Sequence, residues 1–463
     1  MRWSEAMTPV RMQRIALAAP AAALRDMLVN VAVAGVVQLD DVAAEGHSPV
    51  GAGQGTAERP PVLSIAEPDL DALRRADRDD VLAGEAQLRA YAAGATHRDE
   101  VAALTGWCPA AELDQLATRL AGVGAAVVPM PQPLGVDPPT MLGDHDGLEQ
   151  AFAPLVQTYG VVPYRDIDPT IPAGIAYVVM FGMMFGDAGH GILLMAAALL
   201  LRVGRIRRLA SLRDLWLFVG GAGAAATCFG LLYGEFFGPT GVLPVVWLAP
   251  LDDPLRLIAA AVAVGAVLLA VAYGIGIVNR WREGGIRLAL YASSGIAGAA
   301  VFLGIGVVVG GVLLGVTALL ALGVVVTLVG LLLAGFGLFT ESGGGAAGIA
   351  QTGVGSFDLL IRLGSNLVSF ARLAAFGMTH AALGWVVWHA TVGSTGLGPL
   401  GVVAAVVVFL VGNVVTFALE ALVAGVQAMR LEFYELFSRV FVDEGRPFRP
   451  WRIPTITSED ALC

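Results

Sequence analysis

The sequence predicts a mainly α-helical membrane protein, with eight membrane-spanning helices after an N-terminal cytoplasmic domain of two α/β lobes. Composition points to a membrane, because 56% of the 463 residues are hydrophobic, 14% are charged and the mean hydropathy is +0.73. The charges are also segregated. Residues 1–170 hold 23 of the 38 acidic residues and carry a net charge of −11, whereas the remainder carries +1. An acidic soluble segment therefore precedes an apolar one.

Composition also excludes several functions. All 28 basic residues are arginines, and a chain without lysine has no Walker A loop for ATP phosphates. The acidic segment lacks the basic patch that nucleic-acid binding requires. Cys108, Cys228 and Cys463 are too scattered for a zinc site and odd in number for a disulfide framework. We therefore expect no cofactor, no metal and no nucleic-acid partner, and residues 1–39 show no signal peptide.

The N-terminal domain, residues 1–150, is predicted to hold two small α/β units around a helical arm. The first unit is a strand at 11–19, a helix at 20–31 and a strand at 32–39, followed by a flexible loop at 42–62. Apolar residues at helical spacing predict a surface helical hairpin at 66–104, which is the arm. After Gly106-Trp107-Cys108-Pro109, the second unit is a helix at 110–121 and a strand at 124–129. Residues 151–170 are a linker.

Residues 171–437 are predicted to form the membrane domain, and 438–463 a cytoplasmic tail. A bilayer core of about 30 Å needs roughly 20 apolar residues per helix, and Asp168-Pro169 supplies a helix start. The uncharged stretch 288–340 would be about 80 Å long as one helix, so it must turn back, and we place the turn at Gly310-Gly311. The predicted spans are two short helices within 171–202, meeting at Gly186-Asp187, and 214–233, 256–278, 288–309, 312–339, 360–390 and 399–437.

The arginines predict the orientation of these spans. Short cytoplasmic loops retain positive charge, and arginines gather around residues 202–213, 280–287 and 446–452, whereas the loops at 239–255 and 391–398 have none. Both termini are therefore expected in the cytoplasm of an integral membrane protein.

The seventh span carries polar residues in an apolar helix. Ser365, Arg372 and Thr379 are seven residues apart and share one face, with Ser369 and His380 close by. Snorkelling to the membrane surface explains an arginine near a helix end but not Arg372, which lies deep in the predicted span. Such a charge usually faces a cavity or a carboxylate.

The eighth span repeats this pattern. Asn413, Glu420, Gln427 and Tyr434 are again seven residues apart, with Arg430 one turn from Gln427. Residues at equal depth in an antiparallel pair have similar index sums, which places Arg372 level with Arg430 and His380 level with Glu420. Two charge levels fit a proton relay with an arginine block. A purely structural His380–Glu420 pair is the alternative.

Three further ionisable residues, Asp187, His190 and Glu235, lie at the predicted outer ends of their spans. They could line the outer entrance of an ion path. Capping and turn roles are equally compatible with the sequence.

Five motifs carry a resemblance to a known family. They are FGMMFGDAGHG at 181–191, GLLYGEFFG at 230–238, NRWREG at 279–284, SFARLAAFGMTHA at 369–381 and MRLEFYELFSR at 429–439. In this order they closely resemble the a (or I) subunit of V/A-type ATPases, the 116 kDa subunit family. The cytoplasmic arm is shorter here than is usual in that family.

This resemblance implies a stator subunit that provides proton half-channels. The family's essential arginine falls on Arg372, its second arginine on Arg430, and its half-channel acid and histidine on Glu420 and His380. The implied partners are a rotating proteolipid ring, peripheral stalk subunits, and an ATP-hydrolysing head reached through the stalk. The chain itself is then not an enzyme, and a prokaryotic plasma membrane is the expected location.

Two other functions compete with this interpretation. A secondary transporter should show repeated halves with broken helices, but the ionisable residues here concentrate in the last two spans. A non-pumping paralogue that scaffolds assembly would fit the short arm, yet all four ionisable positions are retained.

Overall fold

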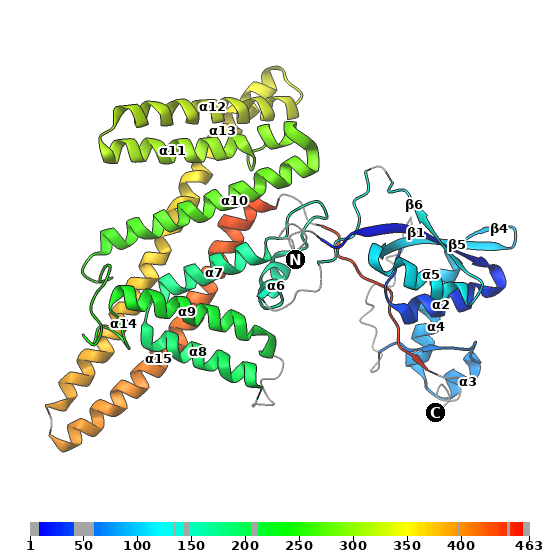
Figure 1. Cartoon of the computed structure of the whole chain (residues 1–463), viewed down its shortest axis with the longest axis horizontal. Coiled ribbons are helices and arrows are strands. Elements are labelled where there is room, and N and C mark those ends of the chain that lie inside the picture. Colours follow the sequence, from blue (N-terminus) through cyan, green and yellow to red (C-terminus); the bar gives the residue numbers. More distant parts are fainter. Residues whose placement is uncertain are drawn as a thin grey trace. The chain divides into compact units, whose positions relative to one another are not determined.

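The computed structural model describes residues 9–40, 60–133, 135–142, 148–204, 212–396, 398–441 and 445–456. These form two compact units (Figure 1). The α/β unit combines the described residues up to 142 with residues 445–456, and the helical unit spans the described residues from 148 to 441. Each is described on its own.

A single sheet organises the α/β unit. Strand β1 (Met12–Pro20) pairs antiparallel with β5 (Val101–Pro109) on one side and β6 (Ala126–Met130) on the other. Two short strands, β2 (Gln38–Leu39) and β4 (Thr96–Arg98), also pair with β5. Alternate β1 residues Ile15, Leu17 and Ala19 are buried, as expected for a sheet with one covered face.

Helices cover one face of this sheet (Figure 1). Leu24 to Ala34 form α2, Asp79 to Ala93 form α4 and Leu113 to Ala121 form α5, and their apolar side chains build the core with β1 and β5. The remaining elements are short: η1 (Ala21–Ala23), β3 (Leu63–Ser64), α3 (Leu70–Arg75) and η2 (Ala110–Glu112).

Three local predictions for this unit need correction. The two predicted lobes are one sheet, because β1 and β5 pair along their whole length. The strand predicted at 32–39 is only Gln38–Leu39, since α2 continues to Ala34 and ends at Gly35, whose φ of 60° stops the helix. The hairpin predicted at 66–104 is helical only up to Ala93, and the rest forms β4 and β5. The predicted loop at 42–62 lies mostly outside the described residues.

The C-terminal segment completes the core of the α/β unit. The Trp451 backbone N–H donates to Val37 O at 2.8 Å, and the Trp451 ring lies 4.8 Å from that of Tyr91. Trp451 and Ile453 are buried in the same cluster as β1 and α2. Strand β7 (Thr455–Ile456) then pairs in parallel with β3. Described residues of the segment predicted as a tail are therefore a structural part of this unit.

Among the described residues, the helical unit contains six stretches long and apolar enough to cross a membrane, one of which, Gly345–Thr395, comprises two consecutive helices, and two shorter apolar helices. Two small helices flank them: α6 (Leu148–Tyr159) comes before, and α16 (Ser438–Val440) follows the π-helical turn η4 (Glu432–Phe437). The apolar helices are α7 (Thr170–Met184), α8 (Ala188–Val203), α9 (Trp216–Tyr233), α10 (Pro254–Tyr291), α11 (Ile296–Leu314), α12 (Thr317–Glu341), α13 (Gly345–Ser369), α14 (Ala371–Thr395) and α15 (Pro399–Leu431). The count of eight spans stays a prediction, because α7 and α8 are short.

Two features of these helices differ from expectation. The turn predicted at Gly310-Gly311 is wrong: both glycines lie inside α11, and the chain turns after Leu314 at Gly315, with φ of 67°. Helix α10 continues past the predicted fourth span to Tyr291, with a break at Gly284-Gly285. The uncharged stretch around Gly315 gives no hydropathy signal for the turn, and the charged residues that suggested an end of the fourth span lie inside α10.

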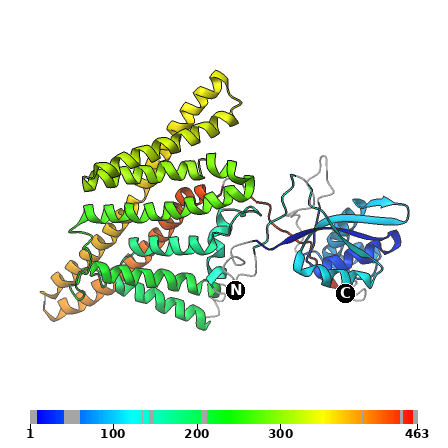
Figure 2. The same ribbon diagram turned by 45° about the horizontal axis from the view of Figure 1, so that its top comes forward.

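Helices α14 and α15 form the antiparallel pair on which the charged residues were expected to meet (Figure 2). A break at Phe370 separates α14 from α13. Helices α7, α8 and α9 pack together beside this pair, and α7 contacts both of its members.

Candidate ion-transfer site

His380 and Glu420 meet inside the helical unit. His380 lies two and a half turns into α14, Glu420 lies on α15, and the His380 Nδ1 atom is in direct contact with Glu420 Oε2. Their exposed fractions are 2% and 9%. The index sums predicted that these residues share one depth, and the contact confirms it.

Asp187 joins this pair from the turn between α7 and α8. Its Oδ1 accepts from the backbone N–H of His190 at 2.9 Å and of Phe237 at 3.0 Å, and its Oδ2 from that of Gly238 at 2.7 Å. Asp187 therefore caps α8 and anchors the loop after α9, which is the structural role the sequence left open. The same bonds fix its carboxylate close to the two histidines.

His190 lies between Asp187 and His380. Its Nδ1 is 3.8 Å from Asp187 Oδ1, and its ring centroid is 5.5 Å from that of His380. Only 1% of its surface is exposed, and neither ring nitrogen has a hydrogen-bond partner among the described residues. The rings of Phe185, Phe237 and Phe417 surround it.

Glu235 completes what we call the buried cluster: Asp187, His190, Glu235, His380 and Glu420. Glu235 is 4% exposed and lies near enough to His380, Asp187 and Glu420 to interact with them electrostatically. Asn413 of the predicted polar stripe lies beside His190. The structure thus brings the three residues predicted for an outer entrance together with the His380–Glu420 pair.

Arg372 lies in a second group, two residues after the break at Phe370. Arg430 and Glu435 are its charged neighbours, and its Nη1 has no hydrogen-bond partner among the described residues. Arg430 lies near enough for its charge to act on Arg372, and the expectation that the two share one depth stays a prediction. Ser369 lies beside Glu435 and donates to Ser365 O at 3.0 Å.

Three residues of this second group escaped the sequence analysis: Glu435, Arg439 and Asn366. In the amide orientation that satisfies both its atoms, Asn366 donates to Glu435 Oε2 at 2.9 Å and accepts from Arg439 at 3.1 Å. We call Arg372, Arg430, Glu435, Arg439 and Asn366 the arginine cluster.

The π-helical turn explains why Glu435 was missed. A seven-residue spacing placed Tyr434 on the polar stripe after Gln427, but η4 widens the helix between Glu432 and Phe437. Tyr434 is consequently 69% exposed, and Glu435 is the residue turned inward. The sequence signal that could have identified Glu435 was the motif at 429–439, which contains the acids Glu432 and Glu435.

The polar stripe of the seventh span points away from the rest of the chain. Ser365 and Thr379 are exposed, and Thr379 donates only to its own helix, at Ala375 O. Arg372 is half-buried between them, and Arg430 of α15 is also exposed. This face is therefore available to a partner within the membrane.

A polar cavity of about 430 Å³ opens next to the arginine cluster. Arg439 belongs to the arginine cluster and also lines the cavity. Helices α10, α12 and α13 contribute the other charged lining residues. These are Arg280, Glu341, Asp358 and Arg362. A cavity of this size and polarity holds many waters.

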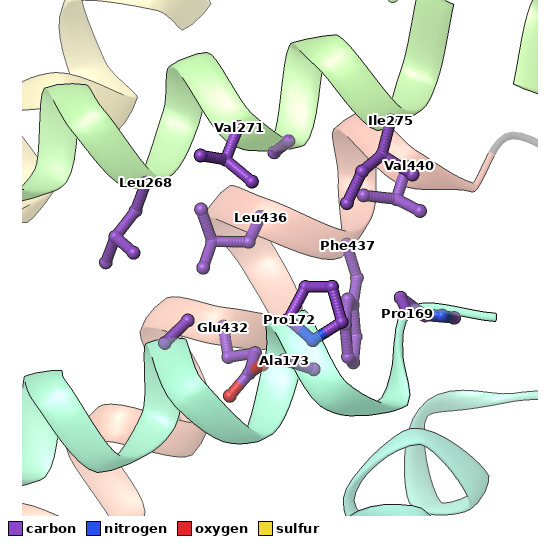
Figure 3. A pocket seen from close by; sticks show the side chains of 12 residues that line it. Pro169, Pro172, Ala173, Leu268, Val271, Ile275, Glu432, Leu436, Phe437 and Val440 are labelled. Atoms are coloured by element: carbon purple, nitrogen blue, oxygen red, sulfur yellow. The ribbon is translucent and has the colours of Figure 1, made fainter. Parts of the chain in front are cut away.

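A much smaller cavity, of about 40 Å³, lies where η4 meets α7 and α10 (Figure 3). Its walls are apolar except for Glu432, which is fully buried and has no hydrogen-bond partner for either carboxyl oxygen among the described residues. Leu268, Val271 and Ile275 of α10 face Leu436 and Phe437 across it.

The fold and the two groups define a polytopic helical membrane protein with paired buried charges. Residues 93–238 match the sequence model of the V-type ATPase 116kDa subunit family. The chain is 29% identical over 369 residues to the A-type ATP synthase subunit I of Aeropyrum pernix, covering 70% of this chain and 52% of that protein. The match to the subunit I of Archaeoglobus fulgidus is 26% over 403 residues, 75% of this chain and 58% of the relative.

A bacterial protein, the V-type ATP synthase subunit I 2 of Treponema pallidum, is 34% identical over 143 residues, which is 29% of this chain and 32% of that protein. These matches confirm the resemblance seen in the motifs: the chain is similar to the V-type ATPase 116kDa subunit family and to the subunits I of A-type and V-type ATP synthases. It spans about half the length of the curated relatives it matches.

Proposed function

We propose that this chain is the stator subunit of a rotary V/A-type ATPase and provides the proton half-channels against a rotating proteolipid ring. The observation that carries the proposal is the placement of Arg372: it is half-buried two residues after Phe370, its Nη1 has no hydrogen-bond partner among the described residues, and Ser365 and Thr379 on the same helix face are exposed.

Arg372 has the chemistry that such a stator needs. A fixed guanidinium lowers the pKa of a carboxylate that passes within a few ångströms, so a ring carboxyl facing Arg372 releases its proton before moving on. Arginine keeps its charge when desolvated and offers a planar fork to a carboxylate, whereas lysine loses its charge more readily. Glu435 and Asn366 hold the side chain of Arg439, which belongs to the same arginine cluster as Arg372.

Two separate polar routes support the half-channels. The 430 Å³ cavity reaches the arginine cluster on the side of Arg362, which we place at the cytoplasm on the positive-inside rule. The buried cluster lies about 12 Å further along α14, since His380 is eight residues from Arg372 and a helix rises about 1.5 Å per residue. His380 and Glu420 then pass protons on the outer side, and the arginines separate the two routes.

The same proposal assigns the remaining partners. The exposed face with Ser365, Thr379 and Arg430 contacts the ring, other apolar helix faces contact lipid, and the acidic α/β unit docks peripheral stalk subunits that connect to an ATP-hydrolysing head. Both termini then lie in the cytoplasm. His380 favours H⁺ over Na⁺ as the transported ion.

A graded set of variants tests this assignment in reconstituted complexes. Arg372→Ala should abolish coupled proton transport and leave assembly intact, because a ring carboxyl then has no reason to deprotonate at the stator. Arg372→Lys should be severely impaired. Glu420→Gln and His380→Ala should slow transport but leave partial activity, since water can bridge a gap in the relay.

Arg256→Ala is the matched control, because Arg256 is exposed near the start of α10 and, among the described residues, forms an ion pair only with Asp253 in its own turn. It should pump at the wild-type rate. Normal coupling in Arg372→Ala together with no transport in Glu420→Gln would reverse the roles assigned here. A secondary transporter would move protons without a ring and an ATP-hydrolysing head, so co-purification of these parts separates the two functions.

A further inference from the structure

Three side chains of the buried cluster have the arrangement of metal ligands. One ligand atom each from Asp187, His190 and His380 lies within 4.8 Å of the other two, and all three residues are buried. They come from the α7–α8 turn, α8 and α14, so no sequence spacing shows them. The expectation of no metal rested on the cysteine spacing alone.

His190 is the observation that points to a ligand. Neither of its ring nitrogens has a partner within hydrogen-bond geometry among the described residues, and the Asn413 amide beside the ring is only a weaker polar neighbour, although the residue is 1% exposed. A buried imidazole without partners costs free energy that a bound cation would recover. Glu420 Oε1 is likewise unpartnered next to His380.

The geometry is close to that of a bound transition metal. Tetrahedral Zn²⁺ holds His nitrogen and carboxylate oxygen at about 2.0–2.2 Å, which separates the ligand atoms by about 3.3 Å. Side-chain rotations that move each ligand by about 1 Å would close the present triangle around an ion.

The surroundings suit a metal of the zinc class. Three backbone N–H groups already orient the Asp187 carboxylate, which is the support that metal-binding carboxylates commonly have. Phe185, Phe237 and Phe417 form an apolar shell. Two imidazoles favour Zn²⁺, Co²⁺ or Cu²⁺ over the oxygen-seeking Ca²⁺ and Mg²⁺.

We propose that Asp187, His190 and His380, with Glu420 as a fourth ligand, bind a divalent cation of the zinc class. Binding ties α8 to α14 and removes the His380 nitrogen and the Glu420 oxygen from proton transfer. The binding stands on the geometry alone; the consequence, that such a cation blocks ion transport, rests on the proposed function.

Binding is tested on the full purified chain in detergent with Co²⁺ as the probe. The wild-type chain should bind Co²⁺ saturably with the visible bands of tetrahedral coordination, Zn²⁺ should displace it, and Zn²⁺ should raise the Tm. His190→Gln should weaken Co²⁺ binding by at least about tenfold, as should His380→Gln. His389→Gln is the control, because His389 is exposed on α14 and bonds only to Trp385 O in its own helix.

A wild-type chain without saturable tetrahedral Co²⁺ binding would overturn the proposal, whatever the variants do. Unchanged Co²⁺ affinity in a His190→Gln chain with wild-type elution and Tm would overturn it too. The ratio of proton flux with and without Zn²⁺ is measured separately in the assembled complex. Cobalt binding without any zinc block would confirm the site and remove the buried cluster from the proposed proton path.

Discussion

Asp166 is a buried acid whose position lies just before the first apolar helix. It is fully buried, and the nearest cation, Arg280, is 4.0 Å away and engaged at 2.5 Å by Glu283. Burial, and then the neighbouring Glu283 carboxyl, raise the pKa of Asp166 to about 8. Arg280 opposes this shift without cancelling it.

This pKa predicts a pH dependence of stability. The unfolded chain loses the Asp166 proton near its ordinary value of 3.8, whereas the folded chain keeps it up to about 8. Between these pH values the folded state binds more protons, so stability falls as pH rises. Asp166→Asn should flatten the fall in Tm between pH 5 and pH 8, measured by thermal unfolding in detergent. The exposed Asp252→Asn should keep the wild-type slope, and an equal slope in both variants would contradict the assignment.

The positions of individual site residues were predictable where regular helical geometry alone determines them. The depth match of His380 with Glu420 follows from an antiparallel pair of regular helices, and it was correct. Glu435 was not predictable in the same way, because one π-helical turn shifts the register by a residue. The approach of Asp187 to His380 depends on tertiary packing, which a sequence pattern does not encode.

At the scale of helices, glycines set how closely α8 and α9 approach. A Cβ on Gly230 would lie 2.1 Å from Ala188 N and 2.5 Å from Asp187 C, which are backbone atoms that cannot swing aside. Small residues at such crossings let helices pack in a membrane. The same contact holds the turn that carries Asp187.

Gly230→Ala should therefore lower the Tm, at a cost of about 1–3 kcal/mol for overpacking. Gly274→Ala in α10 is the matched control, because its Cβ would meet nothing within 4 Å, and alanine favours a helix interior by up to about 1 kcal/mol. The Tm values of the two variants are compared by thermal unfolding in the same detergent. A Gly230→Ala chain as stable as Gly274→Ala would show that this crossing tolerates expansion.

It was easier to predict that a helix or strand exists than to predict the residues at which it begins and ends. Apolar length and period located α9, β1, α5 and β6 within a few residues, whereas α10 ends 13 residues after its predicted span, α11 begins 8 residues late, and the predicted span at 360–390 is parts of two helices, α13 and α14. The turn at Gly315 was missed because α11 and α12 carry no charge on either side of it until Glu341. The single sheet was missed because β1 and β5 are about 90 residues apart, and pairing over that distance leaves no local trace.

At the scale of the whole molecule, residues 445–456 belong to the same α/β unit as the strands near the start of the sequence. The core of the α/β unit contains Trp451 and Ile453, which lie in the segment predicted as a tail at 438–463. Nothing in a short stretch of twelve residues identifies a partner that lies about 400 residues earlier.

Trp451→Ala should destabilise the α/β unit by about 3–5 kcal/mol, the usual cost of removing a buried aromatic side chain. Hydrogen exchange on the full chain should show faster exchange in β1 and β5 and unchanged exchange in α9 to α12. Ile65→Ala, at an exposed position of the same unit, should leave both regions unchanged. Wild-type protection of β1 in Trp451→Ala would mean that the segment is attached to the unit but does not stabilise it.

The return of residues 445–456 to the α/β unit has a consequence for biosynthesis. A ribosome makes the strands β1 and β5 before the apolar helices and Trp451 after them. Until then Tyr91 lacks its aromatic neighbour and β3 its pairing strand. A nascent chain that stalls within the membrane helices consequently presents an unfinished α/β unit to chaperones and proteases, so completion of this unit reports that translation has reached the end of the helical unit.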